Sequence, residues 1–304
     1  MKYWVTYPLV SHPYNEELLT KDALTAFATT AERVGFDGIG FTDHPAPTHR
    51  WLQAGGHDAL DPFAALAFVA AVTDRIRLIP NIVVLPYRNP FLVAKAVATI
   101  DVLSGGRFTL ATATGYLKAE YKALGVDFDE RNDLFDEAIE VLRGVWTTDD
   151  YTFEGRHFTA LGQTSNPKPG RVPLWIGGNA KLSRRRVATV GDGWCPFPAP
   201  RQLAATAKTP ALETPDDLAE MLDYLWRHVD DAGRDPATVD VAFGSPAGGP
   251  PGDDGFDGDA HRGGLAELAA LGVTWAGVNV PGDSLAHALE TLERYGERVI
   301  APSR

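Results

Sequence analysis

One stretch of the sequence, residues 75–116, constrains the fold of this chain more than any other. It begins with Ile76–Leu85, which is rich in valine and isoleucine and therefore favours a β-strand over a helix. A helix with apolar residues at helical spacing starts at Pro90 and ends at Gly105, and Phe108–Ala113 is again extended and apolar. Two apolar strands joined by one helix indicate a parallel pair that is buried on both faces.

This βαβ pattern repeats along the chain. The order helix, glycine, strand recurs at Gly35, Gly191 and Gly272, because glycine is favoured where a helix ends in a left-handed residue. Strands that alternate with helices predict an α/β fold, a closed (β/α)8 TIM barrel, and the alternative is a doubly wound open sheet. The predicted strands are Tyr3–Val10, Phe36–Phe41, Ile76–Leu85, Phe108–Ala113, Pro173–Ile176, Trp194–Phe197, Val239–Phe243 and Val273–Val280.

Two segments fall outside this repeat. Residues 147–172 predict a small insertion, with a hairpin over Tyr151–Phe158. Residues 245–264 are rich in glycine, proline and aspartate, which predicts a flexible loop before a helix over Leu265–Leu271. Such a loop is either a lid over the barrel mouth or a plain surface loop. With these small insertions, we expect residues 1–304 to form a single TIM-barrel domain.

Charge and composition bear on the partners. The chain has 28 Lys and Arg against 40 Asp and Glu, and a net charge of −12 argues against nucleic acid and anionic membranes. Its single cysteine, Cys195, permits neither an intrachain disulfide nor a cysteine-based zinc site. The longest apolar run, Phe63–Val72, is far shorter than the ~20 residues of a membrane span, and no cleavage signal is recognisable. We therefore expect a cytoplasmic protein that acts on a small-molecule substrate.

In a TIM barrel the functional groups lie at the C-terminal ends of the strands. His44 follows the second strand beside Asp43, and it is interpreted either as an acid, base or hydrogen-bond donor, or as a structural imidazole held by a neighbouring carboxylate. The residues at these strand ends are Asp43, His44, Asn81, Thr114, Gly115, Gly177, Gly178 and Cys195.

A glycine pair, Gly177-Gly178, stands with Asn179 between the fifth strand and a helix. Glycines at such a junction let backbone N–H groups approach an anion, and the helix N-terminus adds a favourable partial charge. The basic segment Lys181–Arg186 follows directly. The alternative is a tight turn followed by a solvated helix face, but in the context of a barrel we interpret the segment as a phosphate site.

Three histidines, His44, His49 and His57, suggest a metal site as a further alternative. Their spacing does not place the three side chains on one face of a helix, and the intervening segment is predicted to be a loop. A metal-dependent hydrolase on the same fold is therefore kept only as an alternative.

Several motifs follow one another in an order and spacing that chance rarely produces. They are Gly35-Phe36-Asp37-Gly38 with Asp43-His44, Leu85-Pro86-Tyr87-Arg88-Asn89-Pro90, Asp101 with Leu103-Ser104-Gly105-Gly106-Arg107, Gly115-Tyr116 with Glu120 and Leu124-Gly125, Trp175-Ile176-Gly177-Gly178-Asn179, and Gly191-Asp192-Gly193-Trp194. Together they resemble the bacterial-luciferase-like monooxygenase family, and especially its branch that uses the deazaflavin coenzyme F420. The resemblance covers roughly residues 20–200.

The resemblance implies a TIM barrel that carries F420, or alternatively FMN, with its ring across the barrel mouth. It implies a cis peptide bond between Asn81 and Ile82 behind this ring and phosphate contacts at residues 177–179. It gives His44 a catalytic role, and Tyr116, which replaces a glutamate of the sugar-oxidising members, lines the pocket or donates a proton. The cofactor-binding residues expected on this basis are Asp43, Asn81, Ile82, Thr112, Thr114, Gly115, Gly177, Gly178 and Asn179.

We therefore predict an F420-dependent oxidoreductase that transfers a hydride between the coenzyme and a small organic substrate. The basic segment at residues 181–186 would favour the anionic tail of F420. The alternatives are an FMN-dependent luciferase-like monooxygenase, the metal-dependent hydrolase, and a barrel that binds a ligand without turning it over. A homodimer is one assembly to be expected.

Overall fold

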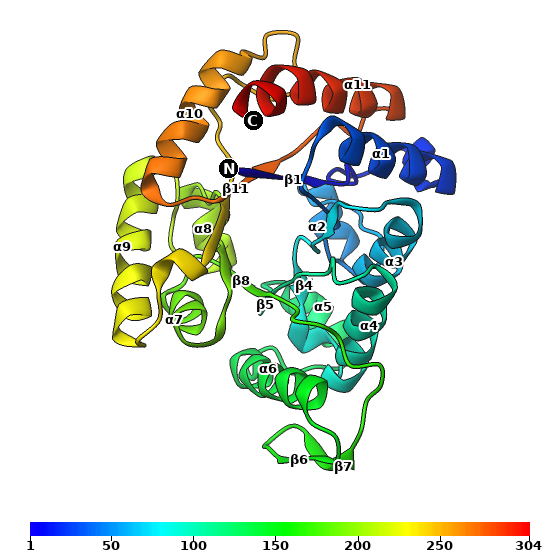
Figure 1. Cartoon of the computed structure of the whole chain (residues 1–304), viewed down its shortest axis with the longest axis vertical. Helices are drawn as coiled ribbons and strands as arrows, with labels where there is room; N and C mark the ends of the chain where they lie inside the picture. The colour runs from blue at the N-terminus through cyan, green and yellow to red at the C-terminus, as the bar shows by residue number, and fades with distance from the viewer.

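The computed structural model describes the backbone of residues 1–304 and the side chains of all of them except residues 203, 206 and 207. Nine parallel strands form one sheet in the order β3-β2-β1-β11-β10-β9-β8-β5-β4, and helices surround it (Figure 1). These strands are β1 (Lys2–Thr6), β2 (Gly38–Gly40), β3 (Arg77–Leu78), β4 (Val83–Val84), β5 (Leu110–Ala113), β8 (Leu174–Gly177), β9 (Gly193–Cys195), β10 (Asp240–Phe243) and β11 (Trp275–Val278).

The helices mostly follow the strands in the alternating order that the sequence predicts. Within the part of the chain that the structure describes, none of them is both long and apolar enough to cross a membrane. The α-helices are α1 (Lys21–Val34), α2 (His49–Gln53), α3 (Pro62–Val72), α4 (Pro90–Leu103), α5 (Lys118–Ala123), α6 (Arg131–Thr147), α7 (Lys181–Val190), α8 (Arg201–Ala207), α9 (Pro215–Asp231), α10 (Gly258–Leu271) and α11 (Leu285–Tyr295).

The sheet closes on itself because its two end strands, β3 and β4, belong to one stretch of chain. At β3, the N–H group of Leu78 donates to the carbonyl oxygen of Arg107, and the N–H group of Thr109 donates to the carbonyl oxygen of Leu78, both at 3.0 Å. These bonds join β3 to the chain that leads into β5. The strands therefore form the predicted (β/α)8 barrel, in which β3 and β4 share one of the eight positions.

The predicted third strand, Ile76–Leu85, is divided rather than continuous. Its first part pairs with the β2 side, where the N–H group of Asn81 donates to the carbonyl oxygen of Phe41 at 2.7 Å. Its second part, β4, pairs with β5 instead. The peptide bond between Asn81 and Ile82 is cis, as the resemblance implies. The predicted strand end becomes a 3-10 turn, Leu85–Tyr87.

The loop predicted over residues 245–264 is shorter than expected. Helix α10 begins at Gly258 rather than at Leu265. The carboxylate of Asp257 caps it by accepting hydrogen bonds from the first-turn N–H groups. Glycines within the helix lower its intrinsic helix propensity, which is why the sequence pattern predicts a loop there.

The predicted insertion carries a hairpin of two antiparallel strands, β6 (Tyr151–Glu154) and β7 (Thr159–Gln163), which lies at one edge of the molecule (Figure 1). The predicted hairpin ends at Phe158, whereas the second strand of the observed hairpin begins only at the next residue. The sequence missed three short helices, α2, α5 and α8, because none of them is long enough to show helical periodicity.

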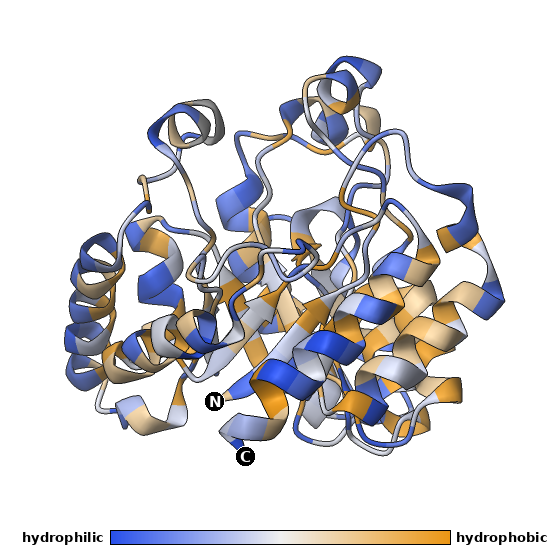
Figure 2. Cartoon of the chain, turned by 90° about the horizontal axis from the view of Figure 1, so that it is seen from above, coloured by the Kyte–Doolittle hydropathy of each residue, from blue (hydrophilic) through white to orange (hydrophobic). Residues whose placement is uncertain are grey.

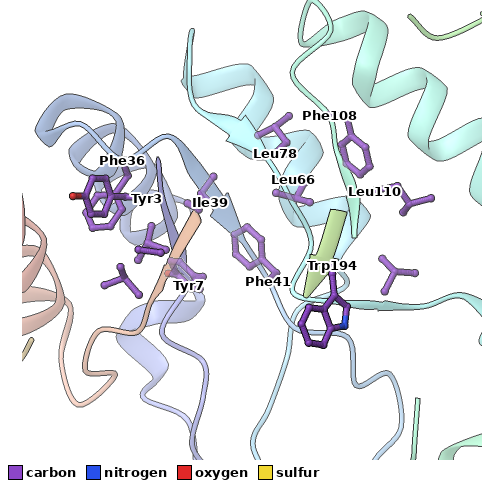
Figure 3. Packing of buried hydrophobic residues seen from close by; sticks show 14 of the residues in the cluster. Tyr3, Tyr7, Phe36, Ile39, Phe41, Leu66, Leu78, Phe108, Leu110 and Trp194 are labelled. Atoms are coloured by element: carbon purple, nitrogen blue, oxygen red, sulfur yellow. The ribbon is translucent and has the colours of Figure 1, made fainter. Parts of the chain in front are cut away.

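The outer core lies between the strands and the helices. Figure 3 shows part of it around Tyr7, Phe36 and Phe41. Phe36 stacks on Tyr295 with the ring centroids 5.5 Å apart, and Tyr7 lies 5.1 Å from Phe41. Polar residues gather on the outward faces of the helices, which are blue in Figure 2. Burial of the opposite, apolar helix faces therefore stabilises the barrel.

The inner core fills the barrel itself and is built around three tryptophans. Trp175 contacts Trp4 and Trp275 edge to face, with ring centroids 6.0 and 5.2 Å apart. The indoles fit because neighbouring strand positions are glycine: a Cβ atom on Gly40 would lie 2.7 Å from the Trp4 ring nitrogen, and one on Gly193 would overlap Trp175. None of the described residues accepts a hydrogen bond from these three indole N–H groups, which indicates a densely packed apolar interior.

Replacement of Gly40 by alanine tests this packing. The added Cβ atom would overlap the carbonyl oxygen of Ile79 and press on Trp4, so we expect Gly40→Ala to lower the free energy of unfolding by ~1–3 kcal/mol. The measurement is urea-induced unfolding. Gly263→Ala is the control, because its Cβ atom would meet open space on the exposed side of α10 and should not destabilise the protein. Equal unfolding midpoints for the two variants would contradict the packing argument.

Candidate active site

A cavity of about 580 Å³ opens at the C-terminal ends of the barrel strands. Eleven residues were expected from the sequence to be catalytic or to bind the cofactor, and ten of them line this cavity. The other, Thr112, is fully buried and donates its hydroxyl proton to the carbonyl oxygen of Val83 at 2.8 Å. Contrary to the expectation, it belongs to the sheet and not to the cavity lining. The ten lining residues are Asp43, His44, Asn81, Ile82, Thr114, Gly115, Tyr116, Gly177, Gly178 and Asn179.

A buried carboxylate orients His44. The Nδ1 atom of His44 lies 3.1 Å from Oε2 of Glu120, a side chain of α5 with no exposed surface. The oxygens of an ionised carboxylate only accept hydrogen bonds, so Nδ1 of His44 is the donor in this contact. Because His44 lines the cavity, Nε2 is the ring nitrogen left for a bound molecule.

Glu120 has two further donors. The N–H group of Ala46 donates to Oε1 at 3.1 Å, and the hydroxyl of Tyr87 donates to Oε2 at 3.0 Å. Three hydrogen bonds to one carboxylate offset the cost of burying its charge. Burial and the charge of Glu120 raise the pKa of Tyr87, so its phenol stays protonated and remains a donor.

Aromatic side chains surround His44. The ring centroids of Trp51, His57 and Tyr116 lie 4.6, 4.9 and 6.3 Å from its own. Burial lowers the pKa of His57, and the adjacent His44 lowers it further, which favours a neutral imidazole. Burial, and then the carboxylate of Glu120, raise the pKa of Tyr116, so its phenol keeps its proton at neutral pH.

Asp43 is committed to an internal ion pair. Its carboxylate accepts two hydrogen bonds from the guanidinium of Arg88, at 2.6 and 2.7 Å, and a third from the N–H group of Val84 at 2.8 Å. The side chain of Asp43 is 1% exposed. A bidentate pair of this kind fixes the end of β2 to the turn after β4, so the carboxylate stabilises the cavity wall.

The glycine segment at residues 177–179 lines the cavity, but its polar groups are mostly used within the protein. The N–H group of Gly178 donates to the carbonyl oxygen of Cys195 at 3.1 Å. The amide of Asn179 donates to the carbonyl oxygen of Phe197 at 2.9 Å and accepts from its N–H group at 3.1 Å. Within the described chain, no side chain caps α7 after Ala180, so the first N–H groups of this helix have no side-chain acceptor.

The basic segment at residues 181–186 does not face the cavity as one group. Arg184 donates to the carbonyl oxygens of Met221 and Asn179, and Arg186 forms a bidentate pair with Asp136 at 2.6 and 2.8 Å. The expectation that this segment as a whole would favour an anionic tail is therefore corrected. Other cations line the cavity near α7: Arg131 and Lys208 form no ion pair with any residue that the structure describes.

The three histidines considered for a metal site are only partly brought together. His44 and His57 are in contact, whereas the ring of His49 faces His12 at 6.2 Å. In the described residues, no group of three or more histidine, cysteine or acidic side chains is placed to hold a metal ion.

Several known proteins are similar to this chain in sequence or in structure. The sequence profile of luciferase-like monooxygenases matches residues 3–247. The chain belongs to the luciferase-like monooxygenase family. An F420-dependent glucose-6-phosphate dehydrogenase of Nocardia farcinica is 33% identical over 177 residues, which cover 56% of this chain and 52% of that protein. One from Beutenbergia cavernae is 32% identical over 203 residues, covering 65% and 59%. The matches span little more than half the length of these relatives.

Solved structures share the fold at low sequence identity. A monooxygenase from Streptomyces bottropensis superimposes with a TM-score of 0.82 at 18% identity, with both chains fully covered. An F420-dependent secondary alcohol dehydrogenase in complex with an F420-acetone adduct gives 0.76 at 20% identity, with 99% of each chain covered. The oxygenating constituent of a type II Baeyer-Villiger monooxygenase from Pseudomonas putida, in complex with FMN, gives 0.75 at 16% identity and covers 98% of this chain and 97% of that one.

The motifs typical of this luciferase-like family converge on the cavity wall. The motif at residues 85–90 supplies Tyr87 and Arg88, which bind the carboxylates of Glu120 and Asp43. The sequence indicates Glu120 as part of a motif but not its role, although Glu120 lies only four residues after Tyr116. It also missed Arg131 and Lys208, because a lone cation carries no sequence signal of the cavity that it lines.

Replacement of Asp43 tests whether its carboxylate stabilises the folded protein. Asp43→Asn removes the buried charge that faces Arg88, so we expect it to lower the free energy of unfolding by about 1.5–3 kcal/mol. Asp61→Asn is the matched control: it removes a more exposed contact to the same arginine, at 3.2 Å, worth at most ~1 kcal/mol, and asparagine still caps α3. Chemical denaturation measures both. An undiminished stability of Asp43→Asn would contradict the structural role.

Proposed function

We propose that this chain is an F420-dependent oxidoreductase that exchanges a hydride between the coenzyme and a small organic substrate. The observation that carries the proposal is the cavity at the barrel mouth, where His44, oriented by Glu120, lies in one chamber with an uncapped helix N-terminus. The relatives named above as F420-dependent support the choice of cofactor. A cytoplasmic location is part of the same proposal.

The cavity fits a flat ring with a phosphorylated arm. Gly177 lets the side chain of Ile82 pack against the end of β8, since a Cβ atom there would lie 2.3 Å from the Cδ1 atom of Ile82 and 3.4 Å from the Cβ atom of Ala113. Gly115 has a φ of +64°, which a side chain would strain. At the other end of the cavity, the N-terminus of α7 favours a phosphate. Arg131 and Lys208, which form no ion pair with a described residue, favour further negative charge.

When bound, F420 would supply the carbon that accepts or releases a hydride. The protein would handle the accompanying proton. His44 presents Nε2 to the cavity and can take a proton from a substrate hydroxyl or return one to a carbonyl oxygen. Glu120 stabilises the imidazolium that forms, and the phenol of Tyr116, kept protonated by its raised pKa, can donate a hydrogen bond at the mouth. Trp51 and His57 exclude water from one side of His44.

An FMN-dependent monooxygenase is the second candidate, because the family profile describes monooxygenases and an FMN arm also ends in a phosphate. The cofactors of the two candidates, F420 and FMN, differ in their ring system and in the charge of the arm. The cations Arg131 and Lys208 favour the more highly charged tail of F420.

Titration of the purified protein with F420 and with FMN tests the cofactor. We expect F420 to bind with a roughly micromolar dissociation constant and FMN to bind more weakly, as measured by fluorescence quenching. Gly177→Val should abolish binding because the valine would displace the side chain of Ile82, which lines the cavity, whereas Gly255→Val, at an exposed glycine with open space around it, should not. Thermal melting controls for folding. If neither cofactor binds at micromolar concentration, the proposal is wrong.

The role of His44 is tested with His44→Ala and Glu120→Gln. We expect His44→Ala to lower kcat by about 10²–10⁴-fold while cofactor affinity is retained. Glu120→Gln should lower kcat and also alter its pH profile, because the carboxylate no longer orients and stabilises the imidazole. Cofactor-coupled absorbance with the best substrate measures both. His49→Ala, outside the cavity lining, is the control, and an activity loss of similar size in that variant would contradict the assignment.

We also propose that two copies of the chain pair through α3 and α4, a homodimer. Helix α3 is apolar on all sides, yet Ala64, Ala67 and Ala71 are exposed. On neighbouring α4, Leu92 and Leu103 are 71% and 75% exposed. Exposed apolar faces of this kind favour association, and alanine allows two helices to approach closely.

The dimer is tested with Ala67→Glu and Leu103→Glu. Each variant places a charge in the proposed interface, so we expect the mass measured by light scattering to fall from that of two chains to that of one. Leu161→Glu on the hairpin, at a residue that is 79% exposed, is the matched control and should keep the mass of the native protein. A native protein that is monomeric at micromolar concentration would refute the pairing.

A further inference from the structure

The two sides of the cavity differ in charge. Arg131 and Arg186 line it from α6 and α7, the helices that follow β5 and β8. Lys208 lines it from the chain after α8, which the hydrogen bond from the amide of Asn179 to the carbonyl oxygen of Pro210 holds near the end of β8. In the closed ring of eight strand positions, β11 lies opposite β5 and β1 lies opposite β8. No charged side chain of the described residues lines the cavity at β10, β11 or β1.

The side at β10, β11 and β1 is mostly apolar. It is lined by Phe243 and Val278. Its polar groups are few. The hydroxyl oxygen of Thr6 already accepts a hydrogen bond from Asn81 at 2.8 Å, whereas Asn279 is exposed and its amide forms no hydrogen bond with any residue that the structure describes.

His44 adjoins this apolar side, because it follows β2 and β2 pairs with β1. A molecule that occupies the apolar side would therefore meet one proton-exchanging group, His44, and one neutral hydrogen-bonding group, Asn279. A carboxylate or phosphate there would lose water without gaining a cation, and an unpaired desolvated charge is costly.

We propose that the substrate of this site is an uncharged molecule with an apolar body and a single carbonyl or hydroxyl oxygen. The inference rests on the proposed function, since it assumes that the cofactor arm takes the cationic side near α7. The apolar body packs against Phe243 and Val278, and the oxygen lies between His44 and Asn279. A sugar phosphate such as glucose 6-phosphate does not fit this side.

The test is equilibrium binding of a matched pair of small molecules to the cofactor-loaded protein. The probes are 4-methylcyclohexanol and 4-hydroxycyclohexanecarboxylate, which differ mainly in charge, with glucose 6-phosphate as a third ligand. We expect the neutral alcohol to bind at least roughly 100-fold more tightly than either anion, because the anion is left without a counter-charge. Calorimetry measures affinity without depending on turnover.

The outcomes separate this inference from the proposed function. Loss of cofactor binding overturns both. If the cofactor binds but an anion binds as well as the neutral alcohol, or if no neutral member of the set binds at millimolar concentration, this inference is wrong and the cofactor assignment stands.

A charge placed on the apolar side gives a second check. Phe243→Lys should shift the affinity ratio towards 4-hydroxycyclohexanecarboxylate by at least about tenfold, because the new ammonium group pairs with the carboxylate. Phe243→Leu is the matched control and should retain the preference for the neutral alcohol. Both variants are compared by thermal melting, and an unchanged ratio in a folded Phe243→Lys protein contradicts the inference.

Discussion

The backbone hydrogen bonds that Leu78 exchanges with Arg107 and Thr109 close the sheet, and the remaining features of the molecule depend on this closure. An open sheet would leave an unpaired edge and would spread its strand ends along a line. Closure removes both edges and gathers the C-terminal ends of all strands around one mouth. His44 after β2 and Glu120 on α5 come from positions 76 residues apart, and they meet because the strands that precede them are neighbours of the closing strand.

Charges inside the molecule are mostly paired before any ligand enters. Asp43 pairs with Arg88, Arg186 pairs with Asp136, and Glu120 accepts three hydrogen bonds. These contacts fix the cavity wall in one geometry, which the proposed hydride exchange would require of its scaffold. The few cations of the cavity that form no ion pair within the described part of the chain lie on one side of it. An anionic group of a bound molecule is therefore stabilised on that side, and an uncharged molecule on the other.

The sequence predicts the barrel because its signals are local. Valine and isoleucine runs, proline at helix starts and glycine at helix ends identify nearly every βα unit without knowledge of the fold. The partners of buried charged groups are different, because they are set by tertiary contacts. Nothing in the sequence shows that Arg184 and Arg186 point into the protein, or that the N–H group of Gly178 is taken by Cys195. For the same reason, the sequence indicates Glu120 only as part of a motif and not as the residue that orients His44.

The tryptophans inside the barrel determine how molecules enter and leave. Trp4 belongs both to this packed interior and to the cavity lining, so it forms a floor under the mouth. A floor of close-packed indoles blocks passage down the barrel axis towards the N-terminal ends of the strands. Of two molecules stacked above it, the deeper one has to arrive first and depart last. The order of association is thus imposed by the shape of the chamber, whatever the affinities of the two molecules.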